Sequence, residues 1–149
     1  MSIHTQRKLR RKLRYNNMVK NNYFYGLGRR KSATARARLF KGKGTITINN
    51  KSAEEYFNGN TTLIAKLTDP LALVGLQKEH DVSVVVSGGG ASGQVDAIRL
   101  AISKSISAMN EDLRGTLKKA SLLKRDPREK ERKKYGLRSA RKKEQFSKR

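Results

Sequence analysis

The chain has 149 residues and a formal net charge of +23, which is unusual for a soluble enzyme and favours a polyanionic partner, either nucleic acid or an anionic membrane surface. It has no cysteine, so disulfides, thiolate nucleophiles and cysteine-ligated metal centres are excluded. No run approaches the roughly 18 consecutive apolar residues that a membrane-spanning helix needs. We therefore expect that the chain does not span a membrane.

The charge is unevenly distributed along the chain. Residues 1–43 carry 14 Lys or Arg and no acidic residue, residues 44–117 carry 6 basic and 8 acidic residues, and residues 118–149 carry 15 basic and 4 acidic residues. The net charges are +14, −2 and +11. Together with the apolar pattern, this predicts a basic extension over 1–22, a globular domain over 23–123 and an extended basic tail over 124–149.

The first 22 residues are Asn-rich, basic and free of acidic residues. Such a start is typical of an organelle transit peptide or of a retained nucleic-acid-binding extension, and we favour the retained extension.

Residues 33–40 begin the regular structure. Alanine and leucine alternate there with polar residues that include Arg36 and Arg38, a period of two that predicts a strand with a basic face. Lys41 to Gly44 allow a turn, and residues 45–49 alternate again. We expect these two strands to form a hairpin with a cationic loop.

Two short helices are predicted next. Ser52 and Glu55 have the spacing of a capping box, which predicts a helix through Tyr56 and Phe57. A second helix over 63–67 would be capped by one of the two threonines before it and ended by Pro70, because proline disfavours helical geometry in the residue that precedes it.

The second half of the domain is predicted as strand, glycine loop and two helices. Residues 82–87 are β-branched and almost wholly apolar, which favours a central strand covered on both sides. Apolar residues then recur at spacings of three and four from Val95 to Met109, with Arg99 and Ser103 on the opposite side. A last helix would be capped by Asn110 and bury Leu113, Leu117 and Ala120.

The glycine run at 88–94 joins the predicted strand to the long helix, as a phosphate-binding P-loop does. The P-loop pattern then requires Lys and Ser or Thr where this chain has Gln94 and Val95, so nucleotide hydrolysis is not expected. The glycines either expose backbone N–H groups to an RNA phosphate or only make a tight turn. We find no catalytic residues, no metal-ligand spacing and no requirement for a cofactor.

Isolated lysines are expected to be solvated surface residues, whereas the basic cluster at 29–38 and the tail are too dense for that. Like charges at this density repel one another, so a polyanion is needed to offset them, and the affinity should fall as salt rises.

Four ordered segments carry a family resemblance: 25–33 (YGLGRRKSA), 88–94 (GGGASGQ), 131–138 (ERKKYGLR) and 145–149 (QFSKR). They closely resemble the ninth protein of the small ribosomal subunit in its bacterial and organellar form, from about Tyr25 to Arg149. Residues 1–22 depart from the usual short start and look more like a plastid or other organellar version, with a bacterial cytoplasmic ribosome as the alternative.

The resemblance implies an α/β fold of the α+β sandwich type, in which helices pack against a small mixed sheet, as in the second domain of the fifth small-subunit protein. It implies a structural, non-enzymatic role in translation, in the head of the small subunit. The implied partners are ribosomal RNA, neighbouring head proteins and the peptidyl-site transfer RNA, which the tail would reach; a homo-oligomer is not expected.

The predicted ribosomal RNA contacts combine the basic clusters with the glycine loop: Arg29, Arg30, Lys31, Arg36, Arg38, Gly88, Gly89, Gly90, Ser92, Gln94, Arg99, Lys133, Lys134, Arg138, Arg141 and Lys142. By the resemblance, Ser147, Lys148 and Arg149 approach the transfer RNA. Tyr135 would either stack on an exposed base or pack onto the domain.

Three other classes of protein remain as alternatives. A chromatin-like or single-strand-binding protein would share the charge but would not need the four ordered segments. A kinase-like enzyme would need a phosphate-gripping lysine and a carboxylate pair. A membrane-active protein would need an amphipathic basic helix, which neither basic arm shows, so we expect no membrane partner.

Overall fold

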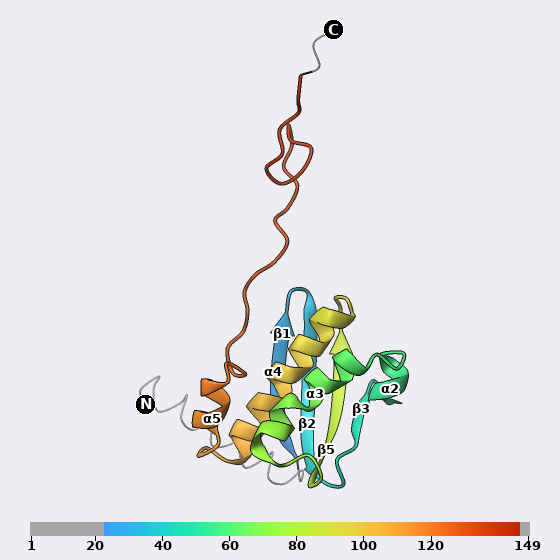
Figure 1. Ribbon diagram of the computed structural model, residues 1–149, viewed down its shortest axis with the longest axis vertical. Helices are drawn as coiled ribbons and strands as arrows, with labels where there is room; N and C mark the ends of the chain where they lie inside the picture. Colours follow the sequence, from blue (N-terminus) through green and yellow to red (C-terminus); the bar gives the residue numbers. More distant parts are fainter. Residues whose placement is uncertain (1–22, 147–149) are drawn as a thin grey trace, which may run out of the picture.

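The computed structural model describes residues 23–146 as one sheet, helices packed against it and a long extended tail (Figure 1). The elements in chain order are β1 (Phe24–Arg30), β2 (Ala33–Lys41), β3 (Ile46–Ile48), β4 (Lys51–Ser52), α2 (Ala53–Tyr56), α3 (Thr61–Val74), β5 (His80–Ser87), α4 (Ala91–Met109) and α5 (Arg114–Lys119). The predictions for residues 1–22 lie outside the described residues.

The sheet is mixed, with the strand order β1-β2-β5-β3-β4. β2 pairs antiparallel with both β1 and β5, and β3 pairs parallel with β5. The predicted hairpin between residues 33–40 and 45–49 is therefore wrong, because β5 lies between those two strands. The hairpin partner of β2 is β1, which we did not predict as a strand.

The glycines of β1 explain why this strand was not predicted, and the packing of α4 explains why glycine is needed there. Gly26 and Gly28 lie under α4, and a Cβ atom would come within 1.9 Å of the Ala101 carbonyl oxygen at Gly26 and within 1.8 Å of the Ala97 carbonyl oxygen at Gly28. Glycine is depleted in strands, so its presence argues against a strand in the sequence. Here it lets the helix backbone rest directly on the strand backbone.

The core lies between the sheet and the helices and covers only one face of the sheet. Val82, Val84 and Val86 of β5 are buried under the helices, whereas Val85 is 44% exposed on the opposite face. The prediction that this strand is central is confirmed by its two neighbours. The prediction that it is covered on both sides is wrong within the described chain, because no layer covers the second face.

The capping prediction for α2 is confirmed for the hydroxyl, because Ser52 Oγ accepts a hydrogen bond from the Glu55 N–H (3.1 Å). The boundaries predicted for α3 are wrong at both ends. Its cap is Asn60, and it continues through Pro70 to end at Gly75 in a left-handed conformation. Pro70 is buried beside Leu71, so the packing of the apolar face outweighs the hydrogen bond that proline cannot donate.

The long helix α4 is confirmed, but one residue within it and one residue after it differ from the prediction. Ser103 is fully buried rather than solvent-facing, and its hydroxyl donates to the Arg99 carbonyl (2.8 Å). Asn110 caps a turn by accepting from the Asp112 N–H (2.9 Å), while α5 begins later, at Arg114. In α5 Leu117 is buried, whereas Ala120, which follows the helix, is exposed.

The predicted fold class is confirmed: the structure is an α+β fold in which helices cover one face of a mixed five-stranded sheet. Within residues 23–146 this arrangement leaves the other face of the sheet uncovered and directs the tail away from the domain (Figure 1).

Candidate nucleic-acid interface

The basic turn between β1 and β2 and the glycine loop lie against each other at one end of the sheet. A Cβ at Gly88 would meet the Ser32 carbonyl oxygen at 2.6 Å, and one at Gly89 would meet the Ala33 Cβ at 2.9 Å. Lys31, at the tip of the turn, is exposed. The fold thus brings together two segments of the predicted interface that lie more than fifty residues apart in the sequence.

The glycine loop is explained by its backbone geometry. Gly88 and Gly89 have φ angles of 74° and 69°, which side chains disfavour, so the tight-turn interpretation accounts for them. Gln94 is also used within the fold, because its Nε2 donates to the Gly88 carbonyl (3.1 Å) and its Oε1 accepts from Tyr56 Oη (3.0 Å). Phosphate binding by this loop and by the exposed Ser92 stays a prediction.

The uncovered face of the sheet is basic and partly aromatic. Arg36 and Arg38 of β2 are exposed there and alternate with alanines that face the helices. The guanidinium of Arg38 lies 5.3 Å from the centre of the Tyr23 ring, which itself packs against Phe40 with a centroid separation of 5.6 Å. This surface combines fixed guanidinium groups with aromatic rings, the combination that binds phosphates and unpaired bases.

An unpredicted acidic residue holds the cationic loop after β2. Asp81 Oδ1 accepts hydrogen bonds from the backbone N–H groups of Lys43 (2.9 Å), Gly44 (2.9 Å) and Thr45 (2.7 Å). These bonds, that from Thr45 first, lower the pKa of the Asp81 carboxyl below its ordinary value. The loop that carries Lys43 is therefore held in place by the partly exposed carboxylate of Asp81 rather than by hairpin pairing.

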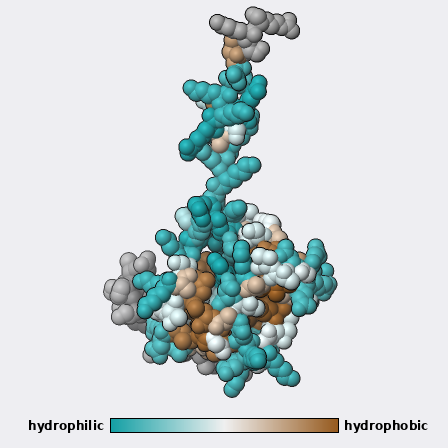
Figure 2. All heavy atoms as spheres, viewed as in Figure 1, coloured by the Kyte–Doolittle hydropathy of each residue, from teal (hydrophilic) through white to brown (hydrophobic). Residues whose placement is uncertain are grey.

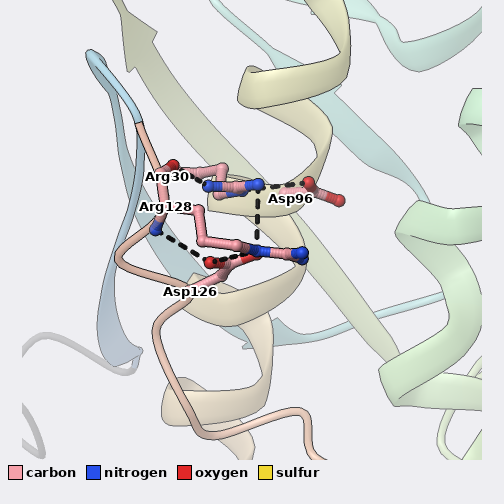
Figure 3. Close-up of polar contacts among 4 residues, drawn as sticks. All are labelled: Arg30, Asp96, Asp126 and Arg128. Atoms are coloured by element: carbon pink, nitrogen blue, oxygen red, sulfur yellow. Dashed lines mark hydrogen bonds and ion pairs between the residues drawn. The ribbon is translucent and has the colours of Figure 1, made fainter. Parts of the chain in front are cut away.

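Arg30 does not point toward solvent as the other cations of its cluster do; its side chain is 14% exposed (Figure 3). Its Nε lies 3.5 Å from Asp96 Oδ2 in the first turns of α4, and its Nη2 lies 3.1 Å from Asp126 Oδ2 at the start of the tail. Its Nη1 donates to the Arg128 carbonyl (2.6 Å). We call Arg30, Asp96, Asp126 and Arg128 the tail-root cluster.

Arg99 also has an intramolecular partner, since its Nη1 lies 3.6 Å from Asp69 Oδ2 of α3. It lines a cavity of about 100 Å³ together with Arg29 and Lys124, beside the tail-root cluster. The carboxylates of Asp96 and Asp126 line the same cavity, so its charge is mixed rather than purely cationic.

The tail leaves the domain as an extended, hydrophilic segment (Figures 1 and 2). The described part of the tail contains a closed loop, in which Leu137 and Lys143 form a bridge and the Arg138 N–H donates to the Lys142 carbonyl (2.8 Å). Glu131, which precedes the loop, accepts from Lys134 Nζ (2.6 Å) and from Arg141 Nε (2.8 Å), and so ties the loop to the chain before it.

These two hydrogen bonds, that from Lys134 first, lower the pKa of Glu131 below its ordinary value. The carboxylate therefore stays charged at neutral pH. It lies between Lys134 and Arg141, two of the predicted RNA contacts, and holds their side chains at a fixed separation.

Tyr135 lies just before this loop, in the turn in which the Leu137 N–H donates to the Lys134 carbonyl, and is 99% exposed. The alternative in which it packs onto the domain is therefore wrong for the described chain. Phe146, further along the tail, is 86% exposed. Large aromatic side chains on a cationic segment with nothing apolar around them are suited to stack on nucleobases.

The acidic residues were the part of the interface that sequence reasoning missed. Asp81, Asp126 and Glu131 each organise a cationic segment. Asp126 and Glu131 could have been noticed as isolated carboxylates in a strongly basic tail, whereas nothing in the sequence around Asp81 pointed to the loop that it holds. The structure does not gather all the predicted contacts in one place. Those of the turn and the glycine loop lie together, except that Arg30 is turned into the tail-root cluster, and Arg36 and Arg38 lie on the open face. Arg99 lies in α4, and the contacts from Lys133 to Lys142 lie along the tail. Ser147, Lys148 and Arg149 lie outside the described residues.

Within residues 23–146 no cluster of three or more potential ligands could hold a metal ion. The helices of the same range include none that is long and apolar enough to cross a membrane.

Comparison with known proteins identifies the family. Residues 28–149 match the model of the family described as ribosomal protein S9/S16. The small ribosomal subunit protein uS9 of Solidesulfovibrio magneticus is 52% identical over 131 residues, which are 88% of this chain and all of that protein. The corresponding protein of a Picosynechococcus strain is 48% identical over 126 residues, covering 85% of this chain and 92% of that protein.

A relative named small ribosomal subunit protein uS9c, from Emiliania huxleyi, is 47% identical over 126 residues, covering 85% of this chain and 96% of that protein. The family match covers more than half of the chain, and the identities extend over nearly the whole of each relative. The chain therefore belongs to the ribosomal protein S9/S16 family, whose members are structural components of the ribosome and not enzymes.

Proposed function

We propose that this protein is a structural component of the small ribosomal subunit that binds ribosomal RNA through its basic turn, the open face of its sheet and its tail, and whose tail end contacts the peptidyl-site transfer RNA. The observation that carries the RNA-binding part is the placement of the cations. Lys31, Arg36 and Arg38 are exposed and held on rigid strands and a tight turn, and the tail adds a continuous cationic extension.

The energetics favour an RNA partner over a solvated surface. A flexible tail loses conformational entropy when it becomes ordered, and its like charges repel one another in the free protein. Neutralising phosphates releases counterions, which offsets both costs. Tyr135 can contribute stacking where the RNA exposes a base. Neighbouring proteins of the subunit head are the expected protein partners, and the relatives named uS9 support a place in the small subunit.

Gradient sedimentation tests the ribosomal placement. The full-length protein should stay with small subunits at salt concentrations that remove loosely bound basic proteins, because its contacts combine phosphate binding with a shaped surface. Dissociation from the small subunits at the same salt concentration as a general cationic protein would contradict the proposal and favour a chromatin-like or single-strand-binding protein.

The transfer RNA contact is tested by removing the last three residues. Deleting Ser147 to Arg149 should leave subunit assembly intact and weaken transfer RNA binding to the peptidyl site, measured by filter binding. The matched control is the pair Lys66→Gln and Lys78→Gln, which removes the same number of positive charges from exposed positions of the domain. Unchanged affinity after the deletion, or an equal loss in the control, would refute the terminal role.

We place the protein in an organellar ribosome, most simply that of a plastid, with a bacterial ribosome as the alternative. The basic, Asn-rich residues 1–22 and the uS9c relative support the plastid, while the uS9 relatives from bacteria support the alternative. Detection of the protein in ribosomes from purified plastids would decide between them.

A further inference from the structure

We propose that Arg30 is a positioning residue for the tail: through the tail-root cluster it fastens residues Asp126 to Arg128 to the domain and so sets the point and direction in which the tail leaves. This deepens the proposed function, because a fixed departure point determines which RNA the tail can reach. The point at which the tail leaves the domain is set by this chain alone and can be measured without RNA.

The first observation is the direction of the side chain. Along β1 residues alternate between the two faces of the sheet, and Arg30 pairs with the buried Ala33 on the helix-covered face. Arg29, its neighbour, is exposed. The guanidinium of Arg30 is thus directed toward α4 and the tail rather than toward a partner in solution (Figure 3).

The second observation is that Arg30 bonds to both sides of one junction. Its Nε lies 3.5 Å from Asp96 of the domain, whereas its Nη2 and Nη1 lie 3.1 Å from the Asp126 carboxylate and 2.6 Å from the Arg128 carbonyl of the tail. A planar guanidinium can serve these acceptors at once because its donors are fixed in a fork, which a lysine ammonium cannot reproduce.

The third observation is that the tail segment is itself pre-shaped for this contact. Asp126 Oδ1 accepts from the Arg128 N–H (2.9 Å), and the two Asp126 oxygens accept from the Arg128 guanidinium at 2.8–3.1 Å. Arg128 is the main cause of the lowered pKa of Asp126, so the carboxylate remains charged and available to Arg30 at neutral pH.

The consequence is a defined hinge. When the cluster is formed, Arg128 is the last residue fixed to the domain. When the cluster is broken, the last fixed residue is Leu122, which is buried against the domain. A probe at Lys130 then lies eight residues from the fixed point instead of two. Because the reach of a flexible chain grows with the square root of its length, the spread of positions of that probe should about double.

Pulsed electron paramagnetic resonance can measure this spread in the full-length protein. The chain has no cysteine, so Lys66→Cys on α3 and Lys130→Cys on the tail provide the only two sites for nitroxide labels. Both positions are exposed. The distance distribution between them is recorded for the otherwise unchanged protein and for variants of the cluster, with far-ultraviolet circular dichroism as a check on folding.

Arg30→Met and Asp126→Asn should each widen the distribution about twofold, and the double variant should be no wider than either single one, because both changes open the same junction. Arg30→Lys should fall between the wild type and Arg30→Met. The matched control, Arg36→Met, removes one positive charge from the open face and should leave the width unchanged.

An unchanged width in folded Arg30→Met, a reference protein already as wide as the variants, or equal widening by Arg36→Met would overturn the inference. Salt-dependent RNA binding by the same Arg36→Met protein tests the proposed function separately. Loss of RNA affinity there with no effect of Arg30→Met on width would refute only the positioning role, while the reverse pattern would refute only the contribution of the open face to RNA binding.

Discussion

The contact between β1 and α4 gives a stringent test of the fold. Gly28→Ala places a Cβ 1.8 Å from the Ala97 carbonyl oxygen and 2.7 Å from the Ala101 nitrogen. Both are backbone atoms of α4, so no side chain can rotate away. Favourable contacts lie at about 3.5 Å, so α4 must withdraw from β1 by roughly 1.7 Å.

This withdrawal affects the whole core, because α4 buries Val95, Ile98 and Ile102 against the sheet. Overpacking costs about 1–3 kcal/mol and more when backbone must move, while replacing glycine in a strand recovers about 0.5–1 kcal/mol of conformational entropy. We expect a net loss of about 2 kcal/mol or more in the free energy of unfolding. For a domain of this size that lowers the midpoint of thermal unfolding by about 8–16 °C.

Urea and thermal unfolding of the full-length protein, followed by circular dichroism, measure the effect. Gly115→Ala is the matched control: it lies inside α5, a Cβ there meets nothing within 4 Å, and alanine should stabilise the helix by about 0.5–1 kcal/mol. If Gly28→Ala matched the wild type within about 0.5 kcal/mol, or if Gly115→Ala were equally destabilising, the close packing of β1 under α4 would be wrong.

Two further predictions concern the interface. Asp81→Asn should destabilise the loop around Lys43 and the domain at neutral pH. The reason is that an amide oxygen is a weaker acceptor than a carboxylate for the three backbone N–H groups that donate to Asp81. The folded pKa of Asp81 is lowered, so its contribution is present above the ordinary aspartate pKa and is lost as the pH falls through the folded value; the gap between the two proteins, followed by unfolding at a series of pH values, should therefore close in acid. Tyr135→Ala should weaken RNA binding by about 1–3 kcal/mol while Tyr135→Phe, which keeps the ring, should not, as measured in a binding assay at fixed salt; equal affinities for all three proteins would exclude stacking.

Short-range patterns predicted local structure well where the local signal agreed with the packing. The alternation at 33–40 gave β2, the apolar repeat from Val95 to Met109 gave α4, and the Ser52 hydroxyl caps α2 as its spacing predicted. These patterns depend on neighbours in the chain, which is why they can be read without the fold.

The errors occurred where distant parts of the chain decide the outcome. Pro70 was expected to end a helix, yet it lies buried inside α3 because the apolar face of that helix continues to Leu71 and beyond. Gly26 and Gly28 made β1 look unlike a strand, although the approach of α4 requires glycine there. In both cases a tertiary contact outweighs a local preference.

What the sequence determined by itself is the distribution of charge: a near-neutral centre and cationic ends, and therefore a polyanionic partner. Electrostatic self-repulsion depends on composition, so it needs no knowledge of the fold. Only the tertiary structure decided which cations are available to that partner. The sequence led us to predict both Arg30 and Arg36 as RNA contacts, but strand alternation and the position of α4 direct Arg30 into the tail-root cluster and leave Arg36 on the open face.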